Sequence, residues 1–358
     1  MLCALRSCAV IVAFMTSTAL ADQVVLVAGG GDKDQDGVPA TQARLHNPFG
    51  IDFDSSGTMY IVELEGGHVH KADSKGIFST IAGNGKKGDA GDGGPAKNAV
   101  FNAMHNLAIA PSGDVYIADT LNNRVRKLDP RTGTIGPFAG TGKKGDSGDG
   151  GPALKAEFGG VYCITFAPDN KTLHLVDLDH RRVHAVDMRS GLVSLVAGNG
   201  QRGVPADGAA AREAPLVDPR AVCSDEHGNV YILERSGNAL RVVDRAGKIR
   251  TVAGTGKAGP SVADCPALEA TLRGPKHLCL DRDGNVIIAD TDNHVIRKFL
   301  VKEKRLVQIA GTGKKGTAGI GGPPDQLEMN QPHGVYVSPA GVLYIVDSWN
   351  DRVLKIEK

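Results

Sequence analysis

Apolar and polar residues alternate in short runs along most of the chain, and turn-forming residues separate the runs. Between residues 81 and 140 the runs lie at 105–110, 114–119, 123–128 and 134–139. Alternation with a period of two is typical of half-buried β-strands. The segments between them, such as PSGD and DPRTG, are rich in turn formers. This stretch therefore predicts a meander of four antiparallel strands.

The same pattern recurs along the chain and is marked by an Ala-Gly pair. Successive pairs are 54, 57, 58, 56 and 57 residues apart. A near-constant period of this size indicates a repeat architecture. We predict an all-β fold, a six-bladed β-propeller with four antiparallel strands per blade. The blades are expected at approximately 48–83, 104–140, 161–198, 219–254, 275–311 and 332–358.

The two ends of the chain are expected to share one blade. The sixth copy has only three runs, at 332–337, 342–347 and 352–356, and the missing run, VVLVAG, lies at 24–29. Pairing of the first and last strands would close the ring and remove exposed sheet edges. The propeller domain is therefore expected to span 22–358.

Several blades resemble NHL repeats, for example GDVYIADTLNNRVRKL at 113–128 and GNVIIADTDNHVIRKF at 284–299. The resemblance covers essentially all of 22–358 and implies the propeller fold. It says little about function, because the family includes enzymes, RNA-binding domains and protein-binding domains.

Residues 1–21 have the features of a signal peptide. Arg6 supplies a basic start, 8–15 is apolar, and 18–21 ends in the small-x-small pattern Ala19-Leu20-Ala21. The apolar run is too short to span a membrane comfortably. We predict a secreted or periplasmic protein with no membrane span after cleavage. The alternative is a retained N-terminal anchor.

The charge balance argues against nucleic acid as a partner. The chain has 41 Lys and Arg against 40 Asp and Glu, a net charge of +1. Loss of Arg6 with the signal peptide brings this charge to zero, so no overall field draws the protein to a polyanion. One propeller accommodates the whole remaining length, and we expect a monomer.

Four cysteines lie beyond the signal peptide. Cys223 and Cys279 occupy matching positions on the inner strands of adjacent blades, which is compatible with a disulfide in an oxidising compartment. The favoured interpretation is that they are small buried residues. Spacing alone does not decide the pairing state. The four are Cys163, Cys223, Cys265 and Cys279.

The first linker contains alternating carboxylates that resemble half of a calcium loop. Asp32, Asp34 and Asp36 precede Gly37, and such oxygen ligands can wrap a hard cation. The twelfth position of the loop is Ala43, where an EF-hand has Glu. The alternatives are a calcium site and an acidic surface turn, and the second is favoured.

Every second strand is expected to end in an acidic residue. A carboxylate that accepts turn N–H groups explains this pattern structurally, and the NHL resemblance implies pairing with a basic residue such as Arg124 or Arg352. We do not assign these acids to catalysis. They are Glu63, Asp119, Asp177, Glu234, Asp290 and Asp347.

The residue type at one aligned position varies among the blades. An apolar plug closes each linker, and four residues later, where the inner strand begins, the residue type varies. This position lies at the mouth of the central channel, on the face that carries the linkers, where six side chains converge into a natural ligand site. The occupants are Phe49, His105, Tyr162, Arg220, Lys276 and His333, and the following position adds Asn106 and His277.

The favoured interpretation of these residues is a binding platform. Arg220 and Lys276 would attract an anionic ligand, and Phe49 and Tyr162 would supply flat contacts. Aromatic residues and Arg are also enriched at binding hot spots. The expected partner is a protein, a peptide or a small anionic molecule.

The alternative is a metal-dependent lyase or hydrolase. The arrangement partly resembles peptidyl-hydroxyglycine amidating lyase, an NHL-type propeller, which implies zinc on His105 and His333 and a role for Tyr162 in the chemistry. If the protein is an enzyme, Tyr162 and Arg220 are the candidate catalytic residues. Catalytic zinc typically has three protein ligands. The family's third His would fall at Arg220. His277 could take its place, but strand alternation predicts that its side chain points the other way.

Overall fold

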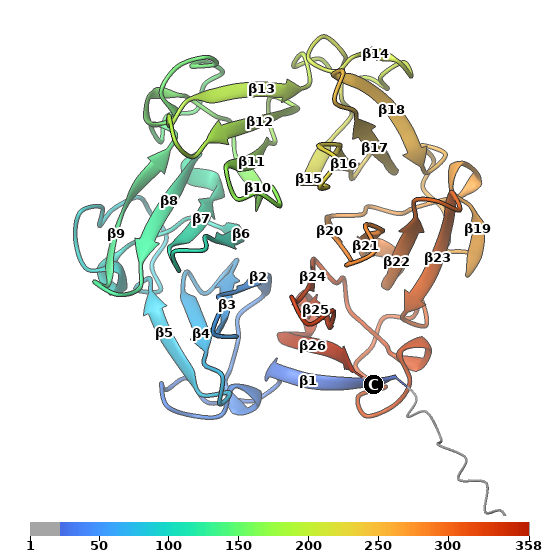
Figure 1. Cartoon of the computed structure of the whole chain (residues 1–358). Helices are drawn as coiled ribbons and strands as arrows, with labels where there is room; N and C mark the ends of the chain where they lie inside the picture. Colours follow the sequence, from blue (N-terminus) through green and yellow to red (C-terminus); the bar gives the residue numbers. More distant parts are fainter. Residues whose placement is uncertain (1–21, 358) are drawn as a thin grey trace, which may run out of the picture.

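The computed structural model describes residues 22–357 and confirms the six-bladed propeller. Six antiparallel sheets surround a central axis, with the innermost strand of each blade facing the channel (Figure 1). The predicted signal peptide, residues 1–21, lies outside the described residues. No helix in the described part of the chain is long and apolar enough to cross a membrane.

The blades follow one another in sequence, and each runs from its inner to its outer strand. Blade 1 has β2 (Pro48–Phe53), β3 (Met59–Glu63), β4 (Val69–Ala72) and β5 (Phe78–Ala82). Blade 2 has β6 (Met104–Ile109), β7 (Val115–Asp119), β8 (Arg124–Asp129) and β9 (Thr134–Ala139). Blade 3 has β10 (Val161–Phe166), β11 (Thr172–Asp177), β12 (Arg182–Asp187) and β13 (Val193–Ala197).

The second half of the ring repeats this order. Blade 4 has β15 (Pro219–Ser224), β16 (Val230–Glu234), β17 (Ala239–Val243) and β18 (Lys248–Ala253). Blade 5 has β20 (His277–Leu280), β21 (Val286–Asp290), β22 (Val295–Leu300) and β23 (Arg305–Ala310). Blade 6 has β24 (Gly334–Val337), β25 (Leu343–Asp347), β26 (Arg352–Glu357) and β1 (Gln23–Gly29).

The N-terminal strand completes blade 6, as the sequence predicts. β1 pairs antiparallel with β26 from Gln23 opposite Glu357 to Gly29 opposite Arg352. Figure 1 shows the two strands side by side at the junction of the chain ends. Because the first strand is hydrogen-bonded to the last, blade 6 has four strands and the ring of blades is closed.

Two blades carry a fifth strand that the repeat pattern does not predict. β14 (Ala209–Ala210) pairs with β18, and β19 (Asp264–Pro266) pairs with β23. Both are short segments of the linkers that lead into blades 4 and 5. They lie along the outermost strand and cover part of its free edge, which would otherwise present unpaired backbone groups.

Short 3-10 helices punctuate the connections. Some lie in the linkers, at Ala40–Gln42, Ala96–Asn98, Ala153–Lys155, Ala267–Glu269 and Pro324–Gln326. The others follow a second strand, at Thr120–Asn122, Thr291–Asn293 and Ser348–Asn350.

The apolar plugs anchor the linkers between the blades. Each plug side chain is at most 1% exposed, so its burial contributes about 1.5–3 kcal/mol of hydrophobic free energy. The sequence pattern therefore identified these positions correctly. The plugs are Leu45, Phe101, Phe158, Leu216, Leu272 and Met329.

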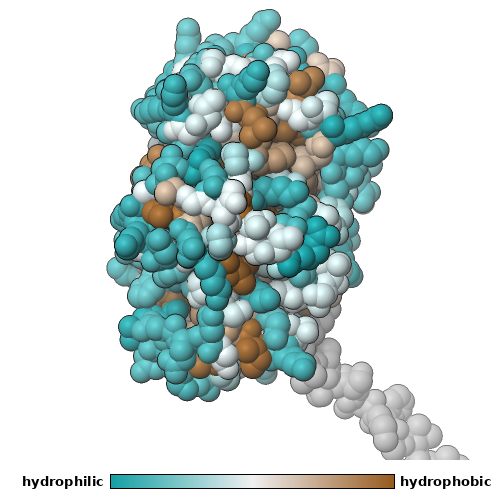
Figure 2. Space-filling model, turned by 90° about the vertical axis from the view of Figure 1, so that its left-hand side faces the viewer, coloured by the Kyte–Doolittle hydropathy of each residue, from teal (hydrophilic) through white to brown (hydrophobic). Residues whose placement is uncertain are grey.

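The rim of the disc is mostly hydrophilic on the side shown in Figure 2. Hydrophobic side chains appear there in small separate groups, and scattered exposed apolar residues are normal on a folded protein. The expectation of a monomer stays a prediction.

Candidate functional site at the channel mouth

The acid at the end of each second strand positions the start of the inner strand of its own blade. All six acids are fully buried and accept a backbone N–H group from the end of the linker before their own blade. This confirms their structural role. The donors are His46, Asn102, Gly159, Val217, Arg273 and Asn330. In every blade the variable residue of the channel mouth lies three positions after this donor.

In five blades, a residue in the left-handed backbone conformation then turns the chain toward the channel. It lies two positions before the variable residue, where the backbone φ angle is positive. Ala103 and Gln331 adopt this conformation without being glycine, which costs about 1 kcal/mol or more each. The five residues are Asn47, Ala103, Gly160, Gly274 and Gln331, with φ of 49°, 56°, 86°, 54° and 51°.

The six variable side chains, here called the mouth ring, contact one another almost all the way around. Phe49 stacks on His333 with 4.0 Å between ring centroids and meets His105 edge-on at 5.2 Å. His105 lies 4.4 Å from Tyr162, and the guanidinium of Arg220 lies 4.9 Å above the Tyr162 ring. The structure thus brings the predicted residues together at one opening.

The two histidines of the mouth ring are neutral. His105 Nδ1 lies 2.9 Å from the carbonyl of Ala103, and His333 Nδ1 lies 2.8 Å from that of Gln331. Burial lowers the pKa of His105 to about 4 and holds the pKa of His333 well below its usual value. The proton therefore resides on Nδ1, and Nε2 of each ring is an acceptor.

The cationic side of the mouth ring is formed by Lys276 and Arg220. Lys276 donates from Nζ to His333 Nε2 at 2.7 Å. Burial lowers the pKa of Lys276 to about 8, against the attraction of Asp292 and with a smaller contribution from nearby arginines. Arg220 pairs with Asp218 at 3.2 Å. Within residues 22–357 no carboxylate lies within ion-pair distance of Lys276, so its charge is available to a ligand.

A small pocket of about 270 Å³ opens beside Arg220 on the same face. Arg181 and Arg202 line it together with Arg220, and Asp179 and Asp218 supply two carboxylates. Sequence reasoning did not find this pocket, because its arginines come from separate turns and linkers of blades 3 and 4.

Asn106 and His277 close the channel below the mouth ring. They belong to blades 2 and 5, which face each other across the axis, and their side-chain nitrogens are 3.1 Å apart. Val335 donates its backbone N–H to His277 Nδ1 at 3.3 Å.

The expectation that His277 points away from the axis is therefore wrong. Alternation along a strand does not yet apply there, because β20 begins only at His277. In blade 2 a β-bulge between Met104 and Asn106 likewise brings consecutive residues toward the channel.

Beyond this closure the channel widens into a cavity of about 400 Å³. Asp52 and Tyr336 line it, as do Cys223 and Cys279. Burial raises the pKa of Asp52 to about 6, although its carboxylate accepts the N–H of Ile109 at 2.8 Å.

The thiols of the described cysteines are free. Cys163 and Cys223 are buried, and Cys265 and Cys279 are half-buried. This agrees with the interpretation as small residues packed in the fold rather than with a Cys223–Cys279 disulfide.

The aspartates of the first linker are exposed on the surface. Asp34 pairs with Arg44 at 3.3 Å, and Asp36 pairs with Lys97 at 3.5 Å and accepts the N–H of Thr80 at 2.7 Å. These partners are those of an acidic surface turn. Calcium binding by Asp32, Asp34 and Asp36 stays a prediction.

Zinc at the mouth ring also stays a prediction, and so does the lyase or hydrolase alternative. Phe49 lies between His105 and His333 and contacts both rings. Among residues 22–357, one group of three candidate ligands has its donor atoms within 4.8 Å of one another, and it lies in blade 1: Glu63, His68 and His70. The sequence signal for it was two histidines, two residues apart, where blade 2 has Arg124 and Arg126.

Family models recognise NHL repeats in this chain. The Teneurin NHL domain model matches residues 152–264, and the NHL repeat model matches residues 272–299 and 329–356. The matches fall in blades 3 to 6 and confirm the resemblance noted in the sequence.

Curated proteins with similar sequences are much longer than this chain. SUPPRESSOR OF QUENCHING 1 of Arabidopsis thaliana is 25% identical over 287 residues, which are 76% of this chain and 27% of that protein. Teneurin-1 of Homo sapiens is 25% identical over 336 residues, which are 84% of this chain and 12% of that protein. NHL repeat-containing protein 2 of Homo sapiens is 24% identical over 329 residues, which are 83% of this chain and 44% of that protein. The chain thus spans less than half the length of each.

Solved structures share the fold at low sequence identity. An auxiliary nutrient binding protein from Bacteroides thetaiotaomicron has a TM-score of 0.68 and 16% identity over 94% of this chain and 76% of that one. Virginiamycin B lyase from Staphylococcus aureus has a TM-score of 0.53 and 13% identity over 94% of this chain and 99% of that one. At these identities the likeness is one of fold alone.

Proposed function

Since the chain is an NHL-repeat propeller, we propose that it is an exported binding platform that takes up a protein, a peptide or a small anionic ligand at the mouth ring. One solved structure with this fold is described as an auxiliary nutrient binding protein. That likeness supports the class of function, and the ligand chemistry is argued from the residues of this chain.

The observation that carries the proposal is the convergence of cations at one side of the mouth ring. Lys276 and Arg220 are neighbours in the ring, and Arg220 also lines the pocket that contains Arg181 and Arg202. Arginine binds carboxylate or phosphate oxygens through paired N–H donors, which fixes orientation as well as charge. A ligand with an anionic group would therefore bind on the Arg220 side.

Aromatic side chains supply the apolar part of the proposed surface. Trp349 is 41% exposed, with its ring centroid 6.5 Å from that of His333, whereas Phe49 and Tyr162 are 4% and 7% exposed and pack against the other side chains of the ring. Large flat side chains beside arginine are characteristic of binding hot spots. A short acidic peptide with an apolar residue combines the two kinds of contact.

Calorimetric titration with a pentaglutamate peptide tests this proposal, with a pentaglutamine peptide as the neutral probe. We expect binding of pentaglutamate alone, and a loss of about tenfold or more in affinity when Arg220→Ala and Lys276→Ala are combined. Lys257→Ala, at an exposed linker lysine, is the control. Equal binding of both peptides, or unchanged affinity of the double variant, would contradict the proposal.

Export is part of the proposal and rests on residues 1–21. Expression of the full chain in a bacterial host, followed by fractionation and N-terminal sequencing, should yield a protein outside the cytoplasm that begins at Asp22. A cytoplasmic protein that keeps residues 1–21 would contradict it.

A further inference from the structure

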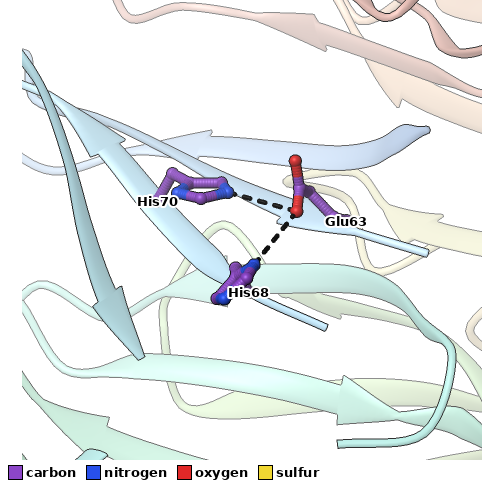
Figure 3. Close-up of side chains that lie close together, drawn as sticks. All are labelled: Glu63, His68 and His70. Carbon is purple, nitrogen blue, oxygen red and sulfur yellow. Dashed lines mark ion pairs between the residues drawn. The ribbon is translucent and has the colours of Figure 1, made fainter. Parts of the chain in front are cut away.

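We propose that Glu63, His68 and His70, here called the blade-1 triad, form a binding site for one divalent transition-metal ion, with zinc as the expected ion. Glu63 ends β3, His70 lies in β4, and His68 lies in the turn between them. Their side chains point toward one another (Figure 3). The site is separate from the mouth ring and from the proposed function.

The separations of Glu63 from the two imidazoles are close to those around a tetrahedral ion. Glu63 Oε2 lies 3.2 Å from His70 Nε2 and 3.6 Å from His68 Nδ1. Zinc binds nitrogen and carboxylate oxygen at about 2.0–2.1 Å, so two ligands of a tetrahedral zinc ion are about 3.3 Å apart. These two separations are close to that value, and all three donor atoms lie within 4.8 Å of one another.

The two innermost donor atoms lack conventional hydrogen-bond partners. Glu63 Oε2 and His70 Nε2 are buried, and neither makes a hydrogen bond of normal geometry in the described structure. The side chains of Glu63 and His70 are 0% and 6% exposed. A buried polar atom without a partner costs about 1–3 kcal/mol. A bound cation would satisfy both atoms.

The remaining polar atoms of these two side chains are already held by neighbours. His70 Nδ1 lies 3.1 Å from Thr80 Oγ1, its ring packs against Phe78 at 4.6 Å, and Glu63 Oε1 accepts the N–H of His46 at 2.7 Å. Metal-binding histidines characteristically donate their other ring N–H to such a partner, which fixes the tautomer. The arrangement leaves Nε2 and Oε2 as the free donors.

The charge balance of blade 1 also differs from that of blades 4 and 6. Arg241 pairs with Glu234 at 2.8 Å in blade 4, and Arg352 pairs with Asp347 at 2.7 Å in blade 6. In the described structure no Arg or Lys lies within ion-pair distance of Glu63, only two imidazoles. A divalent cation would supply the charge that a guanidinium supplies in blades 4 and 6.

Glycines leave room on the solvent side of the triad. A Cβ atom on Gly66 would lie 1.8 Å from Glu63 Oε2, and one on Gly85 would lie 3.2 Å from His68 Cε1. The His68 side chain is 29% exposed. Three protein ligands with an accessible edge leave the fourth position of a zinc ion to water.

Metal titration of the full chain tests the site. The protein is purified, stripped with a chelator and titrated with zinc alone by calorimetry, and bound zinc is counted by mass spectrometry. We expect about one zinc per chain and, with cobalt in its place, the visible absorption of a four-coordinate ion. His70→Arg copies the Glu–Arg pair of blade 4, so it should keep the fold and lose the metal. His227→Ala, at an exposed histidine of blade 4, should bind normally.

Further variants separate this site from the mouth ring. His68→Ala, at the partly exposed ligand, should weaken zinc binding by about tenfold or more even if His70→Arg fails to fold. His105→Ala and His333→Ala should leave stoichiometry unchanged. Loss of zinc in these two variants but not in the triad variants would overturn the proposal. So would the absence of stoichiometric binding, which would leave the triad as a carboxylate held by two imidazoles.

Discussion

Blades 1 and 4 both bury a glutamate at the end of the second strand, but different side chains contact it. In both, the second strand ends in Glu, followed three residues later by Gly: Glu63 with Gly66, and Glu234 with Gly237. Both carboxylates are fully buried and accept a linker N–H. In blade 4 Arg241 Nε then donates to Glu234 Oε2 at 2.8 Å, whereas in blade 1 His70 takes the place of that arginine.

The difference shows how little separates a structural ion pair from a metal site. The long arginine reaches the carboxylate with a permanent charge and an N–H donor, so Glu234 needs nothing else. The shorter imidazole leaves Glu63 Oε2 without a hydrogen bond and adds a nitrogen that can bind a metal. Four predictions test or refine this comparison.

The largest expected effect is the loss of the blade-4 ion pair. Arg241→Ala would leave the buried Glu234 carboxylate without its cation, which destabilises a protein by about 3–5 kcal/mol. Urea unfolding should show this loss. Arg250→Ala, at an exposed arginine nearby, should change stability by less than about 0.5 kcal/mol. Similar values for the two variants would mean that the ion pair does not stabilise the blade.

The next effect is stabilisation of blade 1 by metal. Zinc at one hundred times its dissociation constant should raise the free energy of unfolding by about 2.7 kcal/mol. His70→Arg should show no such increase, because its guanidinium already occupies the site. The measurement is urea unfolding of both proteins with and without zinc. An equal zinc response would place the ion elsewhere.

A smaller effect concerns the channel, where blade 1 has Asp52 and blade 4 has Cys223 at the same position. Burial raises the pKa of Asp52 from 3.8 to about 6. Its bound proton therefore stabilises the folded state fully below about pH 4, and this contribution is lost as the pH rises through about 6.

Asp52→Asn removes that dependence. Relative to the variant, the natural protein should lose up to about 1.4 kcal/mol of stability per pH unit between about pH 4 and 6. Unfolding measured over this range gives the difference, with Asp34→Asn at an exposed aspartate as the control. Parallel pH profiles for Asp52→Asn and the natural protein would exclude the raised pKa.

The smallest effect is expected at the linker that leads into blade 1. Asp34 and Arg44 form an exposed ion pair at 3.3 Å. Such pairs contribute about 0–1 kcal/mol, so Asp34→Ala should change the unfolding free energy by no more than this. A larger loss that appears only with calcium would support a calcium loop instead of a surface turn.

Because of the repeat pattern, most of the fold could be predicted from the sequence. Runs predicted at 105–110, 114–119, 123–128 and 134–139 became strands within one residue of those limits. Alternation, turn residues and period are all local signals, and six copies reinforce one another. The fifth strands β14 and β19 were not predicted because they pair through the backbone alone, and the equivalent pairing in other linkers, such as Pro39 with Ile77, is a single bridge.

The candidate site, like the fold, could be predicted from the sequence only in part. Alignment of the copies placed Phe49 and His105 in one ring, because equivalent positions in a closed propeller face the same opening. It misjudged His277, whose contact with Asn106 joins residues 171 apart and exists only once the ring has closed. The pocket between Arg181 and Arg202 likewise depends on how neighbouring turns are packed.

The sequence by itself determined the architecture, the six acids that hold the inner strands, and the variable mouth ring, because each is encoded in a period that needs no long-range contact to be recognised. The tertiary structure decided which polar atoms are left without partners. Glu63, His68 and His70 are close in the chain, but their proposed ability to bind a metal ion depends on their folded surroundings. These are the burial of the donor atoms, the contact of Thr80 with one imidazole nitrogen, and the absence of a nearby guanidinium in the described blade. Those are properties of packing, and only the folded ring establishes them.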